Sequence, residues 1–339
     1  RAGRSTRGRV SCAVREGRIL FGVPGRQPPV SELRITQHPQ LRRPLLIAGF
    51  AGWNDAGEAA SSAVRFIHRR WRCEAIGEID PEQFYDFTQV RPQVRLRNGE
   101  RFIEWPPNTF SFKRVDHLDR DVILFQGIEP HLAWRTYTET ILEVCRTFDV
   151  SGVLILGALL SEASHTRPVR ISGSATEPEL ARMLGLDEQS RSTYQGPTGI
   201  VGILSQAVRE AGIPMASMWA NIPFYIQRSP NPKGSLALLE RINKGLDFGL
   251  TLHDLEVFAA RFEAQVAADI ETNPEVAEYA RRVMDDDEED EEIVDDDLRD
   301  EIDEAADAGA DAELPDAASM VDELERFLRE QRGDRGSGS

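Results

Sequence analysis

The sequence is poor in cysteine and has no long hydrophobic run. Its three cysteines are odd in number and lack the spacing of metal ligands, which favours a reduced, cytoplasmic compartment over a disulfide framework. No stretch of about 18 consecutive apolar residues occurs, so a membrane span is not expected. With 339 residues, 40% of them hydrophobic, the chain is long enough to bury a sizeable core.

The common catalytic motifs are also missing. The sequence contains no G-x-x-x-x-G-K-[ST] phosphate loop, no G-x-G-x-x-G dinucleotide fingerprint, no G-x-S-x-G nucleophile elbow and no H-E-x-x-H zinc motif. Its six histidines show no metal-ligand spacing. We therefore predict no catalytic residue, no metal and no cofactor. A non-enzymatic function is favoured, and an enzymatic one stays open.

The negative charge is confined to one segment. The formal net charge is -17, but residues 285–304 hold 15 acidic residues and one arginine, and the remaining 42 acidic and 39 basic residues give only -3. The rest of the chain therefore gives no indication of nucleic-acid binding. Like charges repel one another, so we expect the acidic segment to be disordered. It serves either solubility or contact with a basic partner.

One segment, from Leu45 to Val64, reads as a buried strand, a glycine-rich corner and a helix start. Residues 45–48 are uninterrupted apolar residues, as in a strand that is covered on both faces. Asp55 and Glu58 have the spacing of a capping box at the start of a helix. A helix cap is therefore one interpretation of this pair, and a catalytic pair of carboxylates is the other.

Alternation of strands and helices along the chain predicts an α/β fold. We expect a three-layer structure in which a mostly parallel sheet carries helices on both faces. The Asn98-Gly99 pair predicts a β-hairpin over residues 93–105. Further strands are expected at 75–79, 109–115, 121–125, 153–156 and 213–219. Helices are expected at 132–148, 177–184, 235–246 and 253–270, and another is opened by residues 194–199 and runs to about residue 211. The predicted parts are a disordered basic leader (1–30), the α/β domain (31–250), a helical extension (251–284), an acidic disordered linker (285–314) and an amphipathic helix with a flexible tail (315–339).

Polar residues gather where the predicted parallel strands end. Because open α/β sheets bind ligands at the carboxyl ends of their strands, these residues are candidates for ligand binding. They are Trp53, Asn54, Asp55, Glu129, His131, Glu162, His165, Arg167, Asn221 and Tyr225. Thr198 and Gly199 join them, because free amides at the start of the following helix would favour a carboxylate or phosphate.

Several of these residues have a structural alternative. His131 is explained equally by helix capping or packing, and Trp53 by a packing or interface role. Arg167 suits recognition of a carboxylate or phosphate, but an ion pair with Glu162 or Asp55 would also account for it.

Three segments of the chain resemble the PAC2 family, whose members are relatives of the proteasome assembly chaperone PAC2. These segments are AGFAGWNDAGEAASSAV, GALLSEASHTRPVRISG and YQGPTGIVGILSQAVREAGIPMASMWANIPFY. The long actinobacterial members are the most similar. The resemblance implies an α/β fold related to nucleoside phosphorylases and peptidyl hydrolases, and self-association as trimers. It also implies a role in proteasome assembly, with proteasome subunits as partners.

The sequence therefore supports two hypotheses. The first is a non-enzymatic protein that acts through protein–protein contacts, like a proteasome assembly chaperone. The second is a small-molecule-binding protein or enzyme that holds an anionic ligand in a pocket at the carboxyl ends of the parallel strands.

Overall fold

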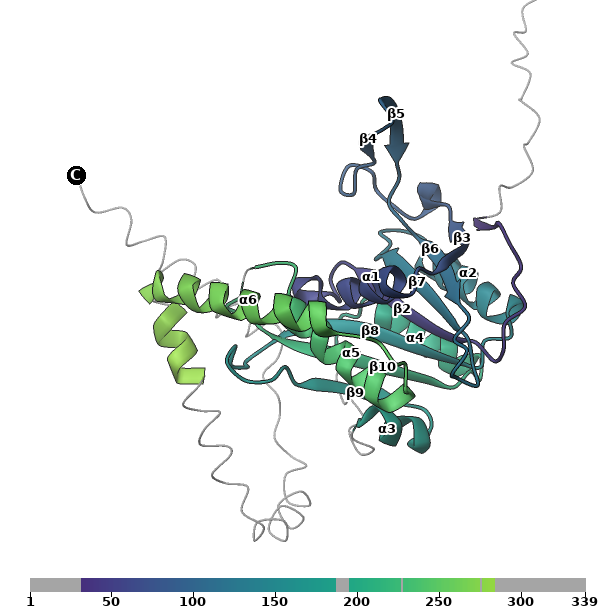
Figure 1. The fold of residues 1–339 in the computed structure, drawn as a ribbon. Helices are drawn as coiled ribbons and strands as arrows, with labels where there is room; N and C mark the ends of the chain where they lie inside the picture. The colour runs from purple at the N-terminus through teal and green to yellow at the C-terminus, as the bar shows by residue number, and fades with distance from the viewer. Residues whose placement is uncertain (1–31, 187–194, 227, 275, 284–339) are drawn as a thin grey trace, which may run out of the picture. The chain divides into compact units, whose positions relative to one another are not determined.

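The computed structural model describes residues 32–186, 195–226, 228–274 and 276–283 (Figure 1). The expected basic leader, the acidic linker, and the terminal helix and tail lie outside the described residues. The chain divides into two compact units at Asn273. Residues 276–283 of the second unit are helical, and the first unit holds the sheet described below.

An eight-stranded sheet forms the centre of the first unit, in the order β1-β3-β6-β7-β2-β8-β10-β9. Four consecutive strands, β7, β2, β8 and β10, run parallel, and the strands on either side of them pair antiparallel. The strands are β1 (Leu33–Ile35), β2 (Leu45–Ala51), β3 (Glu74–Ile79), β6 (Thr109–Lys113), β7 (Val122–Ile128), β8 (Gly152–Ser161), β9 (Ile171–Ala175) and β10 (Met215–Pro223).

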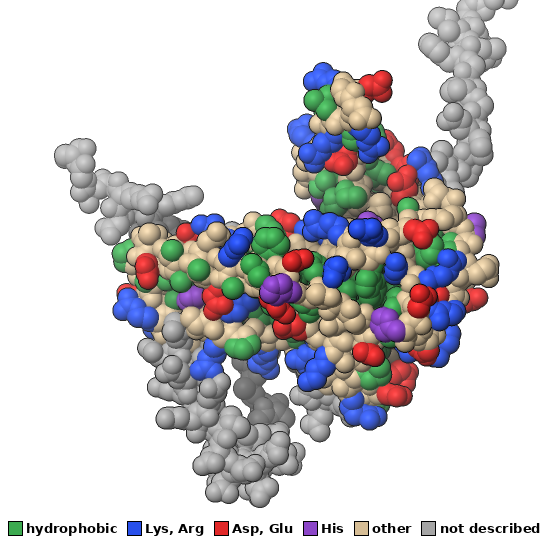
Figure 2. Space-filling view, in the orientation of Figure 1, with side chains coloured by type: hydrophobic (Ala, Val, Ile, Leu, Met, Phe, Trp, Pro, Cys, Tyr) green, Lys and Arg blue, Asp and Glu red, His purple; other side chains and the backbone are tan. Residues whose placement is uncertain are grey.

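The predicted hairpin is present as a separate two-stranded sheet. Strands β4 (Gln93–Arg97) and β5 (Glu100–Glu104) pair antiparallel, and Asn98 and Gly99 both take the positive φ that the tight turn requires. The hairpin projects away from the main sheet (Figure 1), and hydrophobic side chains are visible on its surface (Figure 2).

Helices cover both faces of the main sheet, which confirms the three-layer prediction. Helices α1 (Ala59–Trp71), α3 (Pro178–Leu184) and α5 (Pro232–Leu246) share one core with the sheet, and α2 (Trp134–Thr147) and α4 (Ile200–Glu210) share the other. Helix α6 (His253–Glu271) packs on α5.

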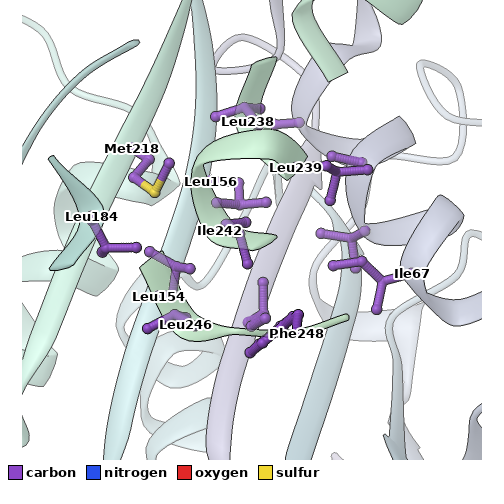
Figure 3. Close-up of a cluster of buried hydrophobic side chains, with 14 of the residues drawn as sticks. Ile67, Leu154, Leu156, Leu184, Met218, Leu238, Leu239, Ile242, Leu246 and Phe248 are labelled. Atoms are coloured by element: carbon purple, nitrogen blue, oxygen red, sulfur yellow. The ribbon is translucent and has the colours of Figure 1, made fainter. Parts of the chain in front are cut away.

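The two cores follow from alternation of apolar residues along each strand. In β2, Ile47 faces one core and Leu46 the other, and both are fully buried. Figure 3 shows the first core, in which α5 side chains such as Ile242 lie over Leu154 and Leu156 of β8. Central strands that are apolar on both faces are what a sheet between two helical layers requires.

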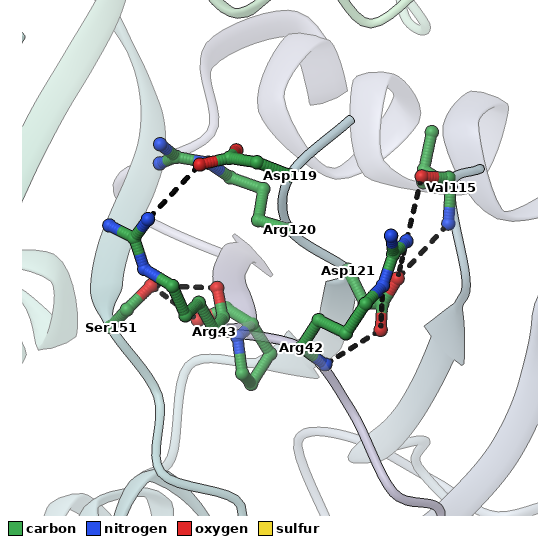
Figure 4. A network of polar contacts seen from close by, with 8 residues as sticks. Arg42, Arg43, Val115, Asp119, Arg120, Asp121 and Ser151 are labelled. Carbon is green, nitrogen blue, oxygen red and sulfur yellow. Dashed lines mark hydrogen bonds and ion pairs between the residues drawn. The ribbon is translucent and has the colours of Figure 1, made fainter. Parts of the chain in front are cut away.

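Ion pairs and hydrogen bonds stabilise the amino-terminal edge of the sheet (Figure 4). Asp121, fully buried before β7, accepts hydrogen bonds from the backbone N–H groups of Arg42 (2.7 Å) and Val115 (3.2 Å). The Arg42 guanidinium also donates to it at 2.7 Å. Burial would raise the pKa of Asp121, but these hydrogen bonds outweigh burial and lower it.

The structure also differs from the sequence-based expectation in its strand boundaries. Strands β1 and β9 were not predicted, because one has three residues and the other contains Ser172, Gly173 and Ser174. Strand β8 extends to Ser161 and β10 to Pro223, beyond the predicted ends at 156 and 219. The two strands pair along all nine residues of β10, which explains their length.

Candidate functional site

The four parallel strands end at one edge of the sheet, and the predicted site residues lie there. Trp53, Asn54 and Asp55 follow β2, and Glu129 and His131 follow β7. Residues 162–167 follow β8, and Asn221 and Tyr225 lie at the end of β10. We call this edge the carboxyl rim. The start of α4, with Thr198 and Gly199, joins it through the contacts of Glu129.

Glu129 connects two of these segments. One carboxylate oxygen accepts a hydrogen bond from the N–H of Trp53 at 3.1 Å, and the other accepts from the N–H of Ile200, the first residue of α4, at 2.8 Å. A carboxylate at a helix N-terminus is favourable because it meets the free amides and the positive end of the helix dipole. The anionic group that the sequence predicts at this helix start is therefore supplied by the chain itself.

Asn54 supports the same helix start. Its side-chain oxygen is 3.4 Å from the N–H of Val201, and its backbone carbonyl accepts from Ala158 N–H at 2.8 Å. Gly199 makes this close packing possible: a Cβ atom there would lie only 2.7 Å from a carboxylate oxygen of Glu129 and closer still to Asn54. Gly199 is also the N-cap of α4, so Thr198 lies one position before the cap.

Asp55 caps helix α1, but the predicted capping box does not form. Its Oδ1 accepts from the N–H groups of Ala60 (2.7 Å) and Ser61 (3.2 Å). Glu58 does not reach back to Asp55, because a short 3-10 turn over Ala56–Glu58 separates them; its carboxylate instead accepts from Ser229 at 2.8 Å. Burial raises the pKa of Asp55 above its ordinary value, because it disfavours the charged form.

His165 belongs to a second polar cluster, in the loop after β8. Its Nδ1 lies 2.9 Å from the hydroxyl of Tyr225, which also accepts from the His165 N–H at 2.8 Å. Lys233 donates to the His165 carbonyl and pairs with Glu263 of α6 at 3.3 Å. Burial, followed by the nearby charge of Lys233, lowers the pKa of His165. The cluster joins this loop to α5 and α6.

The remaining predicted residues are distributed around the rim. His131 accepts from the N–H of Asp86 at 3.0 Å, and Asn221 donates to the carbonyl of Arg170 at 3.0 Å. Glu162 and Thr198 are exposed, and Arg167 is half-buried. The structure thus brings the predicted residues to one edge of the sheet; their role in ligand binding stays a prediction.

Two hollows lie near the loop after β8. The first, bordered by His165, Arg167 and Phe262, has a volume of about 20 Å³, which is room for about one water molecule. The second is an open groove of about 780 Å³ along α5, and its basic residues include Arg241 and Lys244. Only the second is large enough for a small organic ligand.

Large apolar side chains are exposed at the carboxyl rim, and the sequence analysis did not single them out as a group. Strand β8 runs past the helices that cover its first seven residues, which leaves Leu159 and Leu160 in solvent. Trp53 is 64% exposed and Leu160 58%. Phe224 is also exposed, and its N–H donates to Ser161 at the end of β8 (3.2 Å). We call Trp53, Leu159, Leu160 and Phe224 the rim patch.

No helix among the described residues is long and apolar enough to cross a membrane. In the same part of the chain, no group of three or more histidine, cysteine or acidic side chains is arranged to hold a metal ion.

Comparison with known proteins places the fold among solved structures. A family model described as the PAC2 family matches residues 49–269. A PAC2 family protein from Streptomyces avermitilis is similar at 43% identity and a TM-score of 0.64, over 70% of this chain and 99% of that one. A proteasome-assembly chaperone homologue from Mycobacterium tuberculosis is similar at 42% identity and a TM-score of 0.61, over 69% of this chain and 99% of that one.

An archaeal proteasome activator from Pyrococcus furiosus shares the fold, at 16% identity and a TM-score of 0.57, over 70% of this chain and 98% of the activator. No curated protein matches the sequence.

Proposed function

This chain belongs to the PAC2 family, and from that membership we propose that it acts as a non-enzymatic, proteasome-assembly-chaperone-like protein through protein–protein contacts. The Mycobacterium tuberculosis relative described as a proteasome-assembly chaperone homologue supports this role at 42% identity. The proposal includes a cytoplasmic location, self-association as trimers, and proteasome subunits as partners.

The observation that carries the proposal is the rim patch. Large apolar side chains exposed at one edge of a domain are candidates for a protein contact, because apolar surface is unfavourable in water. At the same edge, the carboxylates of Glu129 and Asp55 already accept hydrogen bonds from the chain's own amides. The rim is therefore better suited to an apolar protein surface than to a small anion.

A binding experiment on the rim patch tests this function. The full chain is immobilised and offered unassembled proteasome subunits, and the retained amount is compared among wild type, Trp53→Glu and Leu160→Glu. Phe258→Glu on α6 is the matched control, because Phe258 is also an exposed apolar residue, at 55%. We expect both rim variants to bind at least tenfold more weakly, since burying a new carboxylate in an apolar contact is costly. The control should bind like wild type.

The proposal fails if wild type retains no proteasome subunit and deletion of the gene leaves proteasome assembly unchanged. Thermal unfolding of each variant shows whether the substitution acts on binding alone. Equal loss of binding in Phe258→Glu and the rim variants would remove the rim patch from the proposal.

The groove along α5 favours a second candidate function, the binding of a small anionic ligand. Its volume of about 780 Å³ suits such a ligand. Lys244 in this groove has no ion pair within the described residues. A thermal-shift series with inorganic phosphate, nucleosides and amino acids tests the candidate, because a ligand stabilises by RT ln(1 + [L]/Kd). No stabilisation at millimolar ligand, or the same stabilisation in Lys244→Ala and Arg241→Ala as in wild type, would reject it.

A further inference from the structure

The β4–β5 hairpin is separate from the main sheet. Among the described residues each of its strands pairs only with the other, and the hairpin projects from the body of the first unit (Figure 1). A two-stranded sheet alone in water is only marginally stable and needs packing on at least one face. The two faces of this hairpin differ in how much their side chains are packed against other groups.

The side chains on one face of the hairpin have interaction partners within the hairpin itself. Arg95 forms an ion pair with Glu104 on the opposite strand, at 2.8 Å. The guanidinium of Arg97 lies over the ring of Phe102, 4.9 Å from its centre. This polar face therefore has partners of its own, and it suits contact with solvent.

The other face is an apolar stripe that is largely exposed, and of its side chains Trp105 also contacts the ring of Phe87, with 5.1 Å between the ring centres. Val94 lies opposite Ile103, Leu96 lies opposite Arg101, and Trp105 is the next residue of the alternation. Their exposed fractions are 57% for Val94, 71% for Leu96, 51% for Ile103 and 47% for Trp105. Figure 2 shows apolar side chains on this lobe. Together the four side chains expose roughly 400 Å², the size of patch that marks an interaction site.

We propose that this stripe packs against the same stripe of a second copy of the chain, with the two hairpins antiparallel about a two-fold axis. This inference rests on the self-association proposed above and names one surface that produces it. It does not depend on any contact with proteasome subunits.

The order of side chains along the stripe is the argument for a second copy. From the base of the hairpin to its tip, the stripe reads Trp105, then Val94 with Ile103, then Leu96 with Arg101. A two-fold axis through the middle pair places aliphatic side chains against their own copies. It also brings the cation at each tip onto the aromatic ring at the partner's base, which is a favourable cation–π arrangement. The stripe is therefore complementary to itself, as a two-fold interface must be.

The area and symmetry of the hairpin contact also determine how strong the pairing is and how many copies it joins. Two stripes together bury roughly 800 Å², less than the 1,200–2,000 Å² of a stable interface of standard size, so the pairing alone is reversible. A two-fold contact joins copies in pairs. If a separate three-fold contact forms trimers, the hairpins join two trimers into a hexamer.

Sedimentation of the full chain over a wide range of concentrations tests the proposal. In Leu96→Glu, the new carboxylate enters a two-fold contact twice, and we expect pairing at least tenfold weaker than in wild type. The matched control is Gln93→Glu, which adds the same charge on the polar face and should pair like wild type. Equal melting temperatures of the two variants would show that both remain folded.

A cross-linking experiment gives an independent readout. Val94→Cys should form a disulfide-linked dimer under mild oxidation, because the two copies of this residue meet near the axis. Arg95→Cys, on the polar face, should not. A wild type that is monomeric at every concentration overturns both self-association and this inference. A wild type that associates equally well as Leu96→Glu, with no Val94→Cys cross-link, overturns the hairpin contact alone.

Discussion

Gly199→Ala is the substitution that most directly tests the packing at the carboxyl rim. Gly199 is buried at the start of α4 and has an ordinary φ of -96°, so alanine introduces no backbone strain there. The added Cβ would lie 2.7 Å from a carboxylate oxygen of Glu129 and closer still to the side-chain oxygen of Asn54. Both oxygens must retreat, and both are acceptors for the first amides of the helix.

The expected cost has two parts. Retreat of Glu129 weakens its 2.8 Å hydrogen bond from Ile200 N–H, and a bond to a charged group contributes about 1.5–3 kcal/mol. Overpacking of a close-packed site adds about 1–3 kcal/mol. The smaller entropy of the unfolded chain with alanine offsets about 0.4–1 kcal/mol. We expect a net destabilisation of about 2–4 kcal/mol, which lowers the melting temperature by roughly 5–15 °C in a domain of this size.

Urea and thermal unfolding of Gly199→Ala measure this cost, and Gly152→Ala is the control. A Cβ at Gly152 would meet nothing closer than 3.4 Å, which is ordinary van der Waals contact. We expect the control to change the free energy of unfolding by less than about 1 kcal/mol. Equal stabilities of the two variants would refute the close packing of Asn54 and Glu129 around the helix start.

Three further predictions concern single side chains. Asp121→Ala should destabilise the protein by about 2–4 kcal/mol at pH 7, because the backbone N–H groups of Arg42 and Val115 lose a buried acceptor. Folding lowers the pKa of Asp121, so the carboxylate contributes fully to the free energy of unfolding above its unfolded pKa of about 3.9. That contribution is lost as the pH falls through its folded pKa. Urea unfolding from pH 7 to pH 3 should therefore show the stabilities of the variant and wild type converging. Glu129→Gln keeps the side-chain length but removes the charge at the α4 N-terminus, and should lower the free energy of unfolding by about 0.5–1.5 kcal/mol; unchanged stability would contradict the helix-capping role. Burial raises the pKa of Cys73 to about 11 and of Cys145 to about 12, so mass spectrometry should find both thiols unmodified by iodoacetamide at pH 8 in the folded protein and alkylated in denaturant.

The parts of the fold that the sequence predicts well are those where local pattern and burial agree. The apolar run from Leu45 to Ala48 is strand β2, and Asn98-Gly99 is the hairpin turn. In both cases the signal is carried by adjacent residues. Strand β9 could not be predicted in this way, because Gly173 and Ala175 have low strand propensity and Ile171 is the one β-branched residue among its five. Its place is fixed by hydrogen bonds to β10, whose paired residues lie 41–49 positions away.

In the candidate site, too, some features are predicted from the sequence and others depend on contacts between distant residues. The order of strands and helices correctly predicts that Asn54, Glu129 and His165 lie at one edge of the sheet. The partner of each side chain depends on contacts that are distant in sequence. Glu58 has the spacing of a capping box, but its carboxylate accepts hydrogen bonds from Ser229, 171 residues away, and from Arg65 instead. Residue spacing predicts local hydrogen bonds only where the backbone between the residues is helical, and here a 3-10 turn intervenes.

The same contacts determine which polar groups of the carboxyl rim are already bound within the chain. A buried helix start needs an acceptor for its free amides, and that acceptor comes from a ligand or from the chain. Here the small side chain of Gly199 admits Glu129 and Asn54, so the chain supplies the acceptors and the amides are not left for an external anion. The carboxylates of Glu129 and Asp55 thereby face the chain's own amides. Glu162 and Thr198 stay exposed beside the apolar side chains of Trp53 and Leu160, for which water is a poor environment. Burial of Trp53 and Leu160 against an apolar protein surface would stabilise such a contact, which is the physical basis of the proposed protein–protein function.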